Sequence, residues 1–185
     1  MILPRRSLLL SAASLVAVFA ACSSTQMRRD SVSQAVALIV NANGTPIGTA
    51  QLWQEQNGTV NIDIASLALP AGTHGIHFHE VGMCDGGSTA FSTAGAHYNP
   101  LAKEHGLENP RGPHAGDAPN IVTPAGGIGK VAFSTNRVTL TPGTLTLFDS
   151  NGSSIVVHAS ADDQVSQPAG NSGARIACGV IRAIP

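Results

Sequence analysis

The stretch Gly75-Ile76-His77-Phe78-His79-Glu80 places two histidines two residues apart in an apolar and aromatic segment. Such a segment is typical of a β-strand, in which successive side chains point to opposite faces. His77 and His79 therefore share one face, and Ile76 and Phe78 share the other. The apolar pair can enter a core while both imidazoles converge on one metal ion. The same pattern also fits two unrelated polar residues on a solvated strand.

Short β patterns surround this strand, and from Gln34 onward no apolar period of an α-helix is sustained. The Asn-Gly pairs at 43–44, 57–58 and 151–152 predict tight hairpin turns, because both residues tolerate positive φ. About eight strands predict one all-β domain, a sandwich or flattened barrel. Besides the strand of His77, we expect strands at 36–40, 47–53, 60–64, 128–134, 145–149, 155–158 and 174–184.

Composition agrees with this fold class. Only 11% of the 185 residues are charged and 4% are aromatic, whereas 20 are glycine and 11 are proline. That balance favours a turn-rich β domain over a helical one. The net charge is −1 with histidine neutral, so no basic surface indicates a nucleic-acid-binding protein.

The beginning of the chain predicts export. Arg5-Arg6 precede an apolar run at 8–21 that ends in small residues, as in a secretory signal. The run is short for a membrane span, and a transmembrane anchor is the alternative. We expect a signal peptide at 1–21, a polar tether at 22–33 and the folded domain at 34–185.

Cys22 bears on how the exported chain is attached. Phe19-Ala20-Ala21-Cys22 resembles a bacterial lipobox, in which the cysteine becomes the lipidated first residue of the mature protein. Phe19 departs from the usual leucine, so ordinary cleavage near Ala20 or Ala21 stays open. We expect a protein of the bacterial periplasm or cell envelope that contacts the membrane only through a lipid on Cys22.

The three cysteines are an odd number. If Cys22 carries a lipid or is removed, Cys84 and Cys178 remain as a candidate disulfide in an oxidising compartment. Two buried free thiols are the alternative.

Most of the seven histidines gather around a loop at 81–121 that is rich in glycine and proline. Loops of this length are usually functional or disordered. Three imidazoles and one carboxylate form a tetrahedral set suited to structural zinc, and the loop offers His97, His105, His114 and Asp117. Further imidazoles, suited to a copper site, come from His77, His79 and His158. A bridging role of His97 would complete both sets, but spacing alone does not establish it.

Five successive blocks resemble the signatures of copper–zinc superoxide dismutase, most closely the bacterial periplasmic or lipoprotein type. They are GTHGIHFHEVGMC at 72–84, GAHYNP at 95–100, HAGD at 114–117, VVHASADD at 156–163 and GNSGARIACGVI at 170–181. One block would be a weak signal, whereas five in order across the chain are specific. The resemblance implies an eight-stranded antiparallel Greek-key barrel with a long metal-binding loop and a second active-site loop.

The resemblance also implies the ligand sets. Copper is expected at His77, His79, His97 and His158. Zinc is expected at His97, His105, His114 and Asp117, so that the imidazole of His97 bridges the two ions. Asp162 is expected to link the copper ligand His77 to the zinc ligand His105 from behind, as outer carboxylates of metal sites do. The remaining histidine, His74, is interpreted as a hydrogen-bonded structural residue.

The implied activity converts superoxide to O₂ and hydrogen peroxide by Cu(II)/Cu(I) cycling beside a structural zinc. Arg175 would guide the anion, and His97 would take up and return a proton. No charged residue lies between Asp163 and Arg175, so long-range attraction of superoxide would depend on other groups such as Lys103 or Lys130. A non-catalytic periplasmic copper- or zinc-binding protein on the same fold is the alternative. Either could be a monomer or a homodimer.

Overall fold

The computed structural model describes residues 31–66, 68–86 and 89–185. The signal peptide expected at 1–21, the lipidation expected at Cys22 and most of the tether expected at 22–33 therefore lie outside the described residues. Residues Val32–Pro185 form one compact unit. Within the described part of the chain, no helix is long and apolar enough to cross a membrane.

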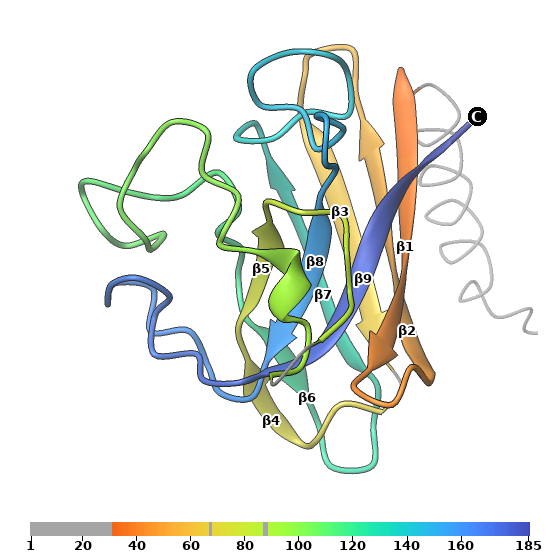
Figure 1. Ribbon diagram of the computed structural model, residues 1–185, viewed down its shortest axis with the longest axis vertical. Coiled ribbons are helices and arrows are strands. Elements are labelled where there is room, and N and C mark those ends of the chain that lie inside the picture. Colours follow the sequence, from red (N-terminus) through yellow and green to blue (C-terminus); the bar gives the residue numbers. More distant parts are fainter. Residues whose placement is uncertain (1–30, 67, 87–88) are drawn as a thin grey trace, which may run out of the picture. The chain divides into compact units, whose positions relative to one another are not determined.

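The described residues form nine strands and one short 3-10 helix, η1 (Ser92–Ala94), shown in Figure 1. The strands are β1 (Ser33–Asn41), β2 (Pro46–Gln54), β3 (Val60–Ser66), β4 (Gly72–His74), β5 (Ile76–His79), β6 (Ile121–Thr123), β7 (Gly129–Thr135), β8 (Ser154–His158) and β9 (Arg175–Ile184).

All nine strands belong to one antiparallel sheet in the order β4-β6-β7-β3-β2-β1-β9-β8-β5. The two edge strands, β4 and β5, are separated in the chain only by Gly75, so the sheet curls until its edges meet (Figure 1). Since β4 and β5 are two halves of one bent strand, the result is an eight-stranded barrel. The connections from β3 to β4 and from β7 to β8 cross over other strands, as in a Greek key. The predicted fold class is confirmed.

Alternation of side chains explains the barrel core. In β3, Val60, Ile62 and Ile64 are buried, whereas the intervening Asn61 and Asp63 point outward and are only partly covered. A shift of one residue would bring these polar side chains into the core, so the pattern specifies the register of the strand.

Two of the three predicted Asn-Gly hairpins are confirmed. Gly44 (φ 77°) joins β1 to β2, and Gly58 (φ 89°) joins β2 to β3. Positive φ is the conformation that tight hairpin turns require and that glycine adopts without strain. The third pair, Asn151-Gly152, forms a turn before β8 but does not connect two strands.

The prediction of a strand at 145–149 is wrong. This segment consists of turns, with one isolated bridge between Thr146 and Thr139. Its apolar pattern instead buries Leu147 in the core from a loop. The strands β4 and β6 were not predicted, because a strand of three residues is too short for a local alternation to stand out. Their pairing with each other completes the ladder at that edge.

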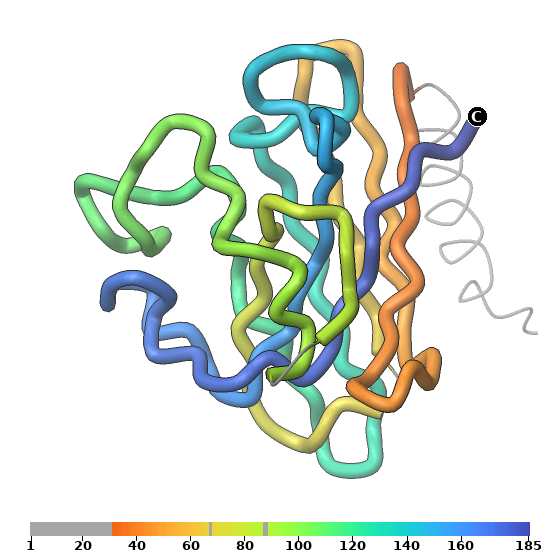
Figure 2. Tube along the Cα trace, viewed as in Figure 1, coloured from red at the N-terminus to blue at the C-terminus, as the bar shows by residue number. Residues whose placement is uncertain are grey.

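Two long loops leave the barrel on one side, as the tube in Figure 2 shows. The first, at 80–120, connects β5 to β6 and includes η1. The second, at 159–174, connects β8 to β9 and lies against it. The histidines of the sequence motifs therefore lie where β5, β8 and the two loops meet.

Candidate metal centre

The two histidines of β5 are covered, not solvated. Ile76 and Phe78 belong to the hydrophobic core, and His77 and His79 on the other face are each 0% exposed. Strand β8 pairs with β5 and ends at His158, whose backbone N–H donates to the carbonyl of Gly75 at 2.9 Å. The sheet thus brings a third imidazole beside the first two, and the alternative of two unrelated solvated histidines is excluded.

We use the name nitrogen cluster for His77, His79, His97 and His158. One potential ligand atom from each of these residues lies within 4.8 Å of those of the others. Each imidazole from the sheet is oriented by one ring nitrogen: His77 Nε2 lies 2.7 Å from an Asp162 oxygen, and the Nδ1 atoms of His79 and His158 lie 3.1 Å from the Gly95 and Gly173 carbonyls.

The other ring nitrogens of the three sheet histidines are buried and have no hydrogen-bond partner among the described residues. These atoms are His77 Nδ1, His79 Nε2 and His158 Nε2. A buried polar atom without a partner is costly, so an arrangement of three calls for a common partner. A metal ion satisfies all of them at once, and an all-nitrogen set suits copper.

Burial also keeps these rings neutral. It lowers the pKa of His77 to about 3, that of His79 to about 2 and that of His158 to about 4. Burial disfavours the charged imidazolium, and neighbouring histidines lower each pKa further. At neutral pH the unpaired nitrogens therefore carry lone pairs, the form that binds metal.

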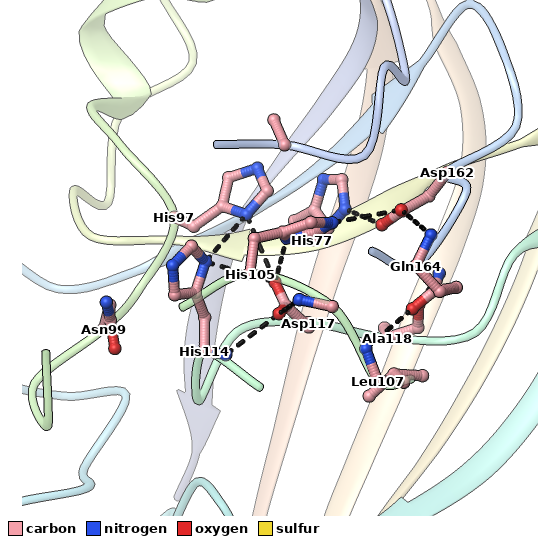
Figure 3. Close-up of polar contacts among 12 residues, drawn as sticks. His77, His97, Asn99, His105, Leu107, His114, Asp117, Ala118, Asp162 and Gln164 are labelled. Atoms are coloured by element: carbon pink, nitrogen blue, oxygen red, sulfur yellow. Dashed lines mark hydrogen bonds and ion pairs between the residues drawn. The ribbon is translucent and has the colours of Figure 1, made fainter. Parts of the chain in front are cut away.

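We use the name mixed cluster for His97, His105, His114 and Asp117, all of which come from the first loop (Figure 3). The Nδ1 atoms of the three histidines lie 3.2, 2.9 and 3.4 Å from one oxygen, Asp117 Oδ1. The Nδ1 atoms of His97 and His114 are 3.4 Å apart. Ligands about 2.0–2.1 Å from a tetrahedral zinc are about 3.3 Å from one another, so these donors fit that geometry.

A distance criterion alone groups His77 with His97, His105 and Asp117 in place of His114. We favour His114 as the fourth member of the mixed cluster. The free nitrogen of His77 belongs to the nitrogen cluster and its other nitrogen contacts Asp162, whereas His114 contacts the same Asp117 oxygen as His97 and His105.

Asp117 is held as an anion. Its Oδ2 accepts backbone N–H bonds from Gly106 at 2.7 Å and His114 at 2.9 Å. Burial by itself would raise the pKa of Asp117, but hydrogen bonds with the three imidazoles and Gly106 outweigh it and hold the pKa far below its usual range. Behind it, Arg137 Nη2 donates to the Asp117 carbonyl at 2.8 Å.

Asp162 connects the two clusters from behind (Figure 3). Its Oδ2 lies 2.7 Å from His77 Nε2, and its Oδ1 lies 3.0 Å from His105 Nε2. Burial would raise the pKa of this carboxyl, but its bonds to His105 and His77 lower it overall. As an acceptor, the ionised carboxylate keeps a proton on Nε2 of both rings, so Nδ1 is the ring position that would bind a metal.

Arg175 lies beside the nitrogen cluster at the start of β9. Its Nη1 donates to the Phe91 carbonyl at 2.7 Å and its Nη2 to the Gly95 carbonyl at 2.6 Å. The Gly95 carbonyl also faces His79 Nδ1. Arg175 also lines an open cleft of about 410 Å³, together with Thr89, Ala90, Ser92, Gly173 and Ala174.

The disulfide Cys84–Cys178 is present, with an S–S distance of 2.05 Å. It joins the first loop to β9, so both the strand that carries Arg175 and the loop that supplies its carbonyl partners are tied together. The alternative of two free thiols is wrong.

His74 lies in neither cluster. It is buried, and its ring nitrogens contact the carbonyls of His158 at 2.9 Å and Pro70 at 3.0 Å. Its interpretation as a structural histidine is confirmed.

Sequence reasoning missed the backbone groups that orient the donors: the carbonyls of Gly95 and Gly173 and the N–H of Gly106. Every residue has such groups, so no residue type marks them in the sequence.

Comparison with known proteins places this arrangement in a family. The family described as copper/zinc superoxide dismutase matches residues 46–181. The chain is 45% identical over 145 residues to superoxide dismutase [Cu-Zn] 1 of Aquifex aeolicus, covering 78% of this chain and 85% of that one. It is 39% identical over 151 residues to superoxide dismutase [Cu-Zn] of Caulobacter vibrioides, covering 80% and 85%.

Among solved structures, the chain resembles a superoxide dismutase-like protein from Bacillus subtilis, with 37% identity and a TM-score of 0.72. The match covers 78% of this chain and 95% of that chain. With five sequence signatures, a closed barrel and two joined clusters of metal donors all in agreement, the chain belongs to the copper/zinc superoxide dismutase family.

Proposed function

We propose that the protein is a superoxide dismutase that converts superoxide to O₂ and hydrogen peroxide. Its relatives from Aquifex aeolicus and Caulobacter vibrioides carry that name. The observation that carries the proposal is the position of His97, which belongs to the nitrogen cluster while its Nδ1 lies 3.2 Å from Asp117 in the mixed cluster. A redox-active ion and an inert ion could therefore share this one imidazole.

In this proposal the nitrogen cluster holds copper and the mixed cluster holds zinc. When bound, copper supplies the reversible one-electron chemistry, whereas zinc has none and serves to organise the loop. The donors support this division, because the first set is all nitrogen and the second combines three imidazoles with an anionic oxygen.

The chain itself binds the substrate and moves a proton. Arg175 presents a fixed positive charge and several N–H donors to the cleft, which suits a small anion such as superoxide. His97 Nδ1 is committed to the mixed cluster, so Nε2 is the ring position that takes up a proton and returns it during turnover. The Gly95 carbonyl orients both Arg175 and His79, so it holds the cationic group beside the nitrogen cluster.

The alternative is a copper- or zinc-binding protein of the same fold without turnover. Loss of a ligand or of the arginine would favour it. This chain retains four histidines in the nitrogen cluster and places Arg175 beside them, so the enzyme is the better-supported candidate.

We further propose export to the bacterial periplasm or cell envelope, with a signal peptide at 1–21, a tether from residue 22 to 33 and a lipid on Cys22. The disulfide supports it, since such bonds persist in oxidising compartments. Mass spectrometry of the mature N-terminus tests it: an unmodified start at Ala21 or Ser23 would exclude the lipid but not export.

Metal analysis and a superoxide assay on protein reconstituted with copper and zinc test the function. We expect one copper and one zinc per chain and rapid superoxide removal. We also expect a changed copper signal in the electron paramagnetic resonance spectrum when His97 is replaced by Ala, because one copper ligand is then lost. Full metal loading without turnover would favour the binding protein. An unchanged copper spectrum in His97→Ala would rule out the shared imidazole.

A further inference from the structure

Gln164 lies where the two long loops meet, and none of the sequence motifs gives it a role. It is half-buried and follows Asp162 by two residues on the second loop. Its backbone φ is 64°, a left-handed conformation that residues other than glycine, asparagine and aspartate rarely adopt. Such strain persists only where the surrounding contacts impose it, and it is concentrated at functional sites.

The backbone of Gln164 orients the carboxylate that joins the clusters. Its N–H donates to Asp162 Oδ1 at 2.7 Å, and the same oxygen lies 3.0 Å from His105 Nε2. This bond keeps Oδ1 directed toward His105 and leaves Oδ2 for His77.

The side-chain amide of Gln164 reaches the first loop next to two members of the mixed cluster (Figure 3). Its Oε1 accepts the N–H of Leu107 at 3.3 Å, and its Nε2 donates to the carbonyl of Ala118 at 3.2 Å. Leu107 closely follows His105, and Ala118 directly follows Asp117. One amide therefore ties together the chain segments that carry two of the four donors.

The first loop can approach the second closely because of the residues at the contact, Gly106 and Gln164. The carbonyl of Gln164 accepts the N–H of Glu108 at 3.1 Å. A side chain on Gly106, whose φ is 110°, would place its Cβ 2.0 Å from that carbonyl oxygen. Because only glycine fits there, the first loop can lie directly against Gln164.

We propose that the side-chain amide of Gln164 is a positioning group for the mixed cluster and thereby sets its affinity for zinc. The inference rests on the proposed assignment of zinc to this cluster. Gln164 is not a member of either cluster, and its amide acts through the backbone of residues next to the ligands.

The test compares Gln164→Gly with Asn171→Gly. Asn171 lies on the same loop, also has positive φ (52°), and uses its side chain to bond Asp163 on that loop. Glycine adopts the positive φ of both positions without strain, so both variants can keep the backbone conformation and a difference between them reports the lost amide of Gln164. Zinc affinity is measured by chelator competition, and cobalt(II) placed in the zinc site reports its geometry through the visible spectrum.

We expect Gln164→Gly to lower zinc affinity about ten- to hundredfold, the usual effect of losing an outer partner of a metal site, and to shift the cobalt spectrum. Asn171→Gly should leave both within about twofold. Gln164→Glu, which retains an acceptor for Leu107 but directs an oxygen at the Ala118 carbonyl, should lose most of the affinity as well. It replaces the glycine variant if that one fails to fold.

The outcomes distinguish a wrong assignment of the zinc ligands from a wrong role for Gln164. If the unaltered protein binds neither zinc nor cobalt through this cluster, the proposed ligand assignment fails. If the unaltered protein binds zinc and both Gln164 variants bind it equally well, the role of Gln164 is overturned. A lowered melting temperature with unchanged zinc affinity and cobalt spectrum would also overturn it, because that pattern marks a purely structural residue.

Discussion

At the scale of single residues, Arg175 shows how backbone acceptors orient a charged group. Two carbonyls hold its guanidinium beside His79 and His158, and its charge lowers the pKa of both rings in addition to burial. Since the second loop carries no charge from residue 164 to 174, we propose that local attraction of superoxide in the cleft depends on Arg175.

We therefore predict that Arg175→Ile keeps both metals but lowers the superoxide rate about tenfold or more and flattens its dependence on salt, because electrostatic steering is screened by ions. Stopped-flow decay of superoxide at several ionic strengths measures this. Arg111→Ile is a matched control, since Arg111 is exposed and pairs with Glu104. An unchanged rate at low salt would remove Arg175 from the mechanism.

His105 provides a second prediction at this scale. Burial lowers its pKa, but Asp117 and Asp162 raise it more, so that the pKa is about 9 in the metal-free protein. Zinc binding at Nδ1 must displace the proton that His105 holds below pH 9. We expect about one proton to be released per zinc at pH 7, with zinc affinity rising about tenfold per pH unit. Calorimetry in buffers of different ionisation enthalpy measures the proton, and binding without release would contradict the prediction.

At the scale of elements, β9 and the first loop act together through the disulfide. The bond joins cysteines that are 94 residues apart in sequence. It fixes the carbonyls of Phe91 and Gly95 relative to Arg175. The stabilisation of the fold and the orientation of Arg175 thus depend on the same covalent link.

We predict that replacing Cys84 and Cys178 together by serine lowers the free energy of unfolding by about 3–5 kcal/mol, since a long loop is no longer closed in the unfolded chain. Chemical denaturation measures this. The superoxide rate should fall further than the copper content, because Arg175 loses its alignment before the sheet histidines lose theirs. Equal losses of rate and copper would show that the disulfide acts on the metal site as a whole.

At the scale of the whole molecule, the barrel and the metal centre have separate sources of stability. The core consists mainly of aliphatic side chains from the strands, joined by Phe78, Tyr98 and loop residues such as Leu147. The two clusters lie on the other face of β5, where the long loops cover it. The hydrophobic core does not need a metal ion to exclude water.

Metal removal should therefore leave the β-sheet signal in far-ultraviolet circular dichroism unchanged. We expect the melting temperature to fall, because a ligand that binds only the folded state stabilises it by mass action. Hydrogen exchange should quicken at 105–118 and 162–167 and stay slow in β2 and β3. Loss of the sheet signal on chelation would show that the metals hold the barrel itself.

Much of this protein is determined by its sequence alone. The alternation in Ile76-His77-Phe78-His79 assigns two imidazoles to one strand face, since a strand has a period of two whatever surrounds it. Glycine at 44 and 58 predicts two hairpins, because the ability to adopt the required positive φ belongs to glycine itself. The residue types likewise determine that the metal donors are imidazole nitrogens and a carboxylate oxygen.

Tertiary structure decided which groups pair. The apolar pattern at 145–149 could not reveal whether a neighbouring strand was present, and it buries side chains from a loop instead. Asp162 oxygens, the carbonyls of Gly95 and Gly173 and the amide of Gln164 contact residues distant in the chain. A hydrogen bond forms only when donor and acceptor lie within a few tenths of an ångström of the favoured distance. For residues so far apart in sequence, only the folded chain determines that distance.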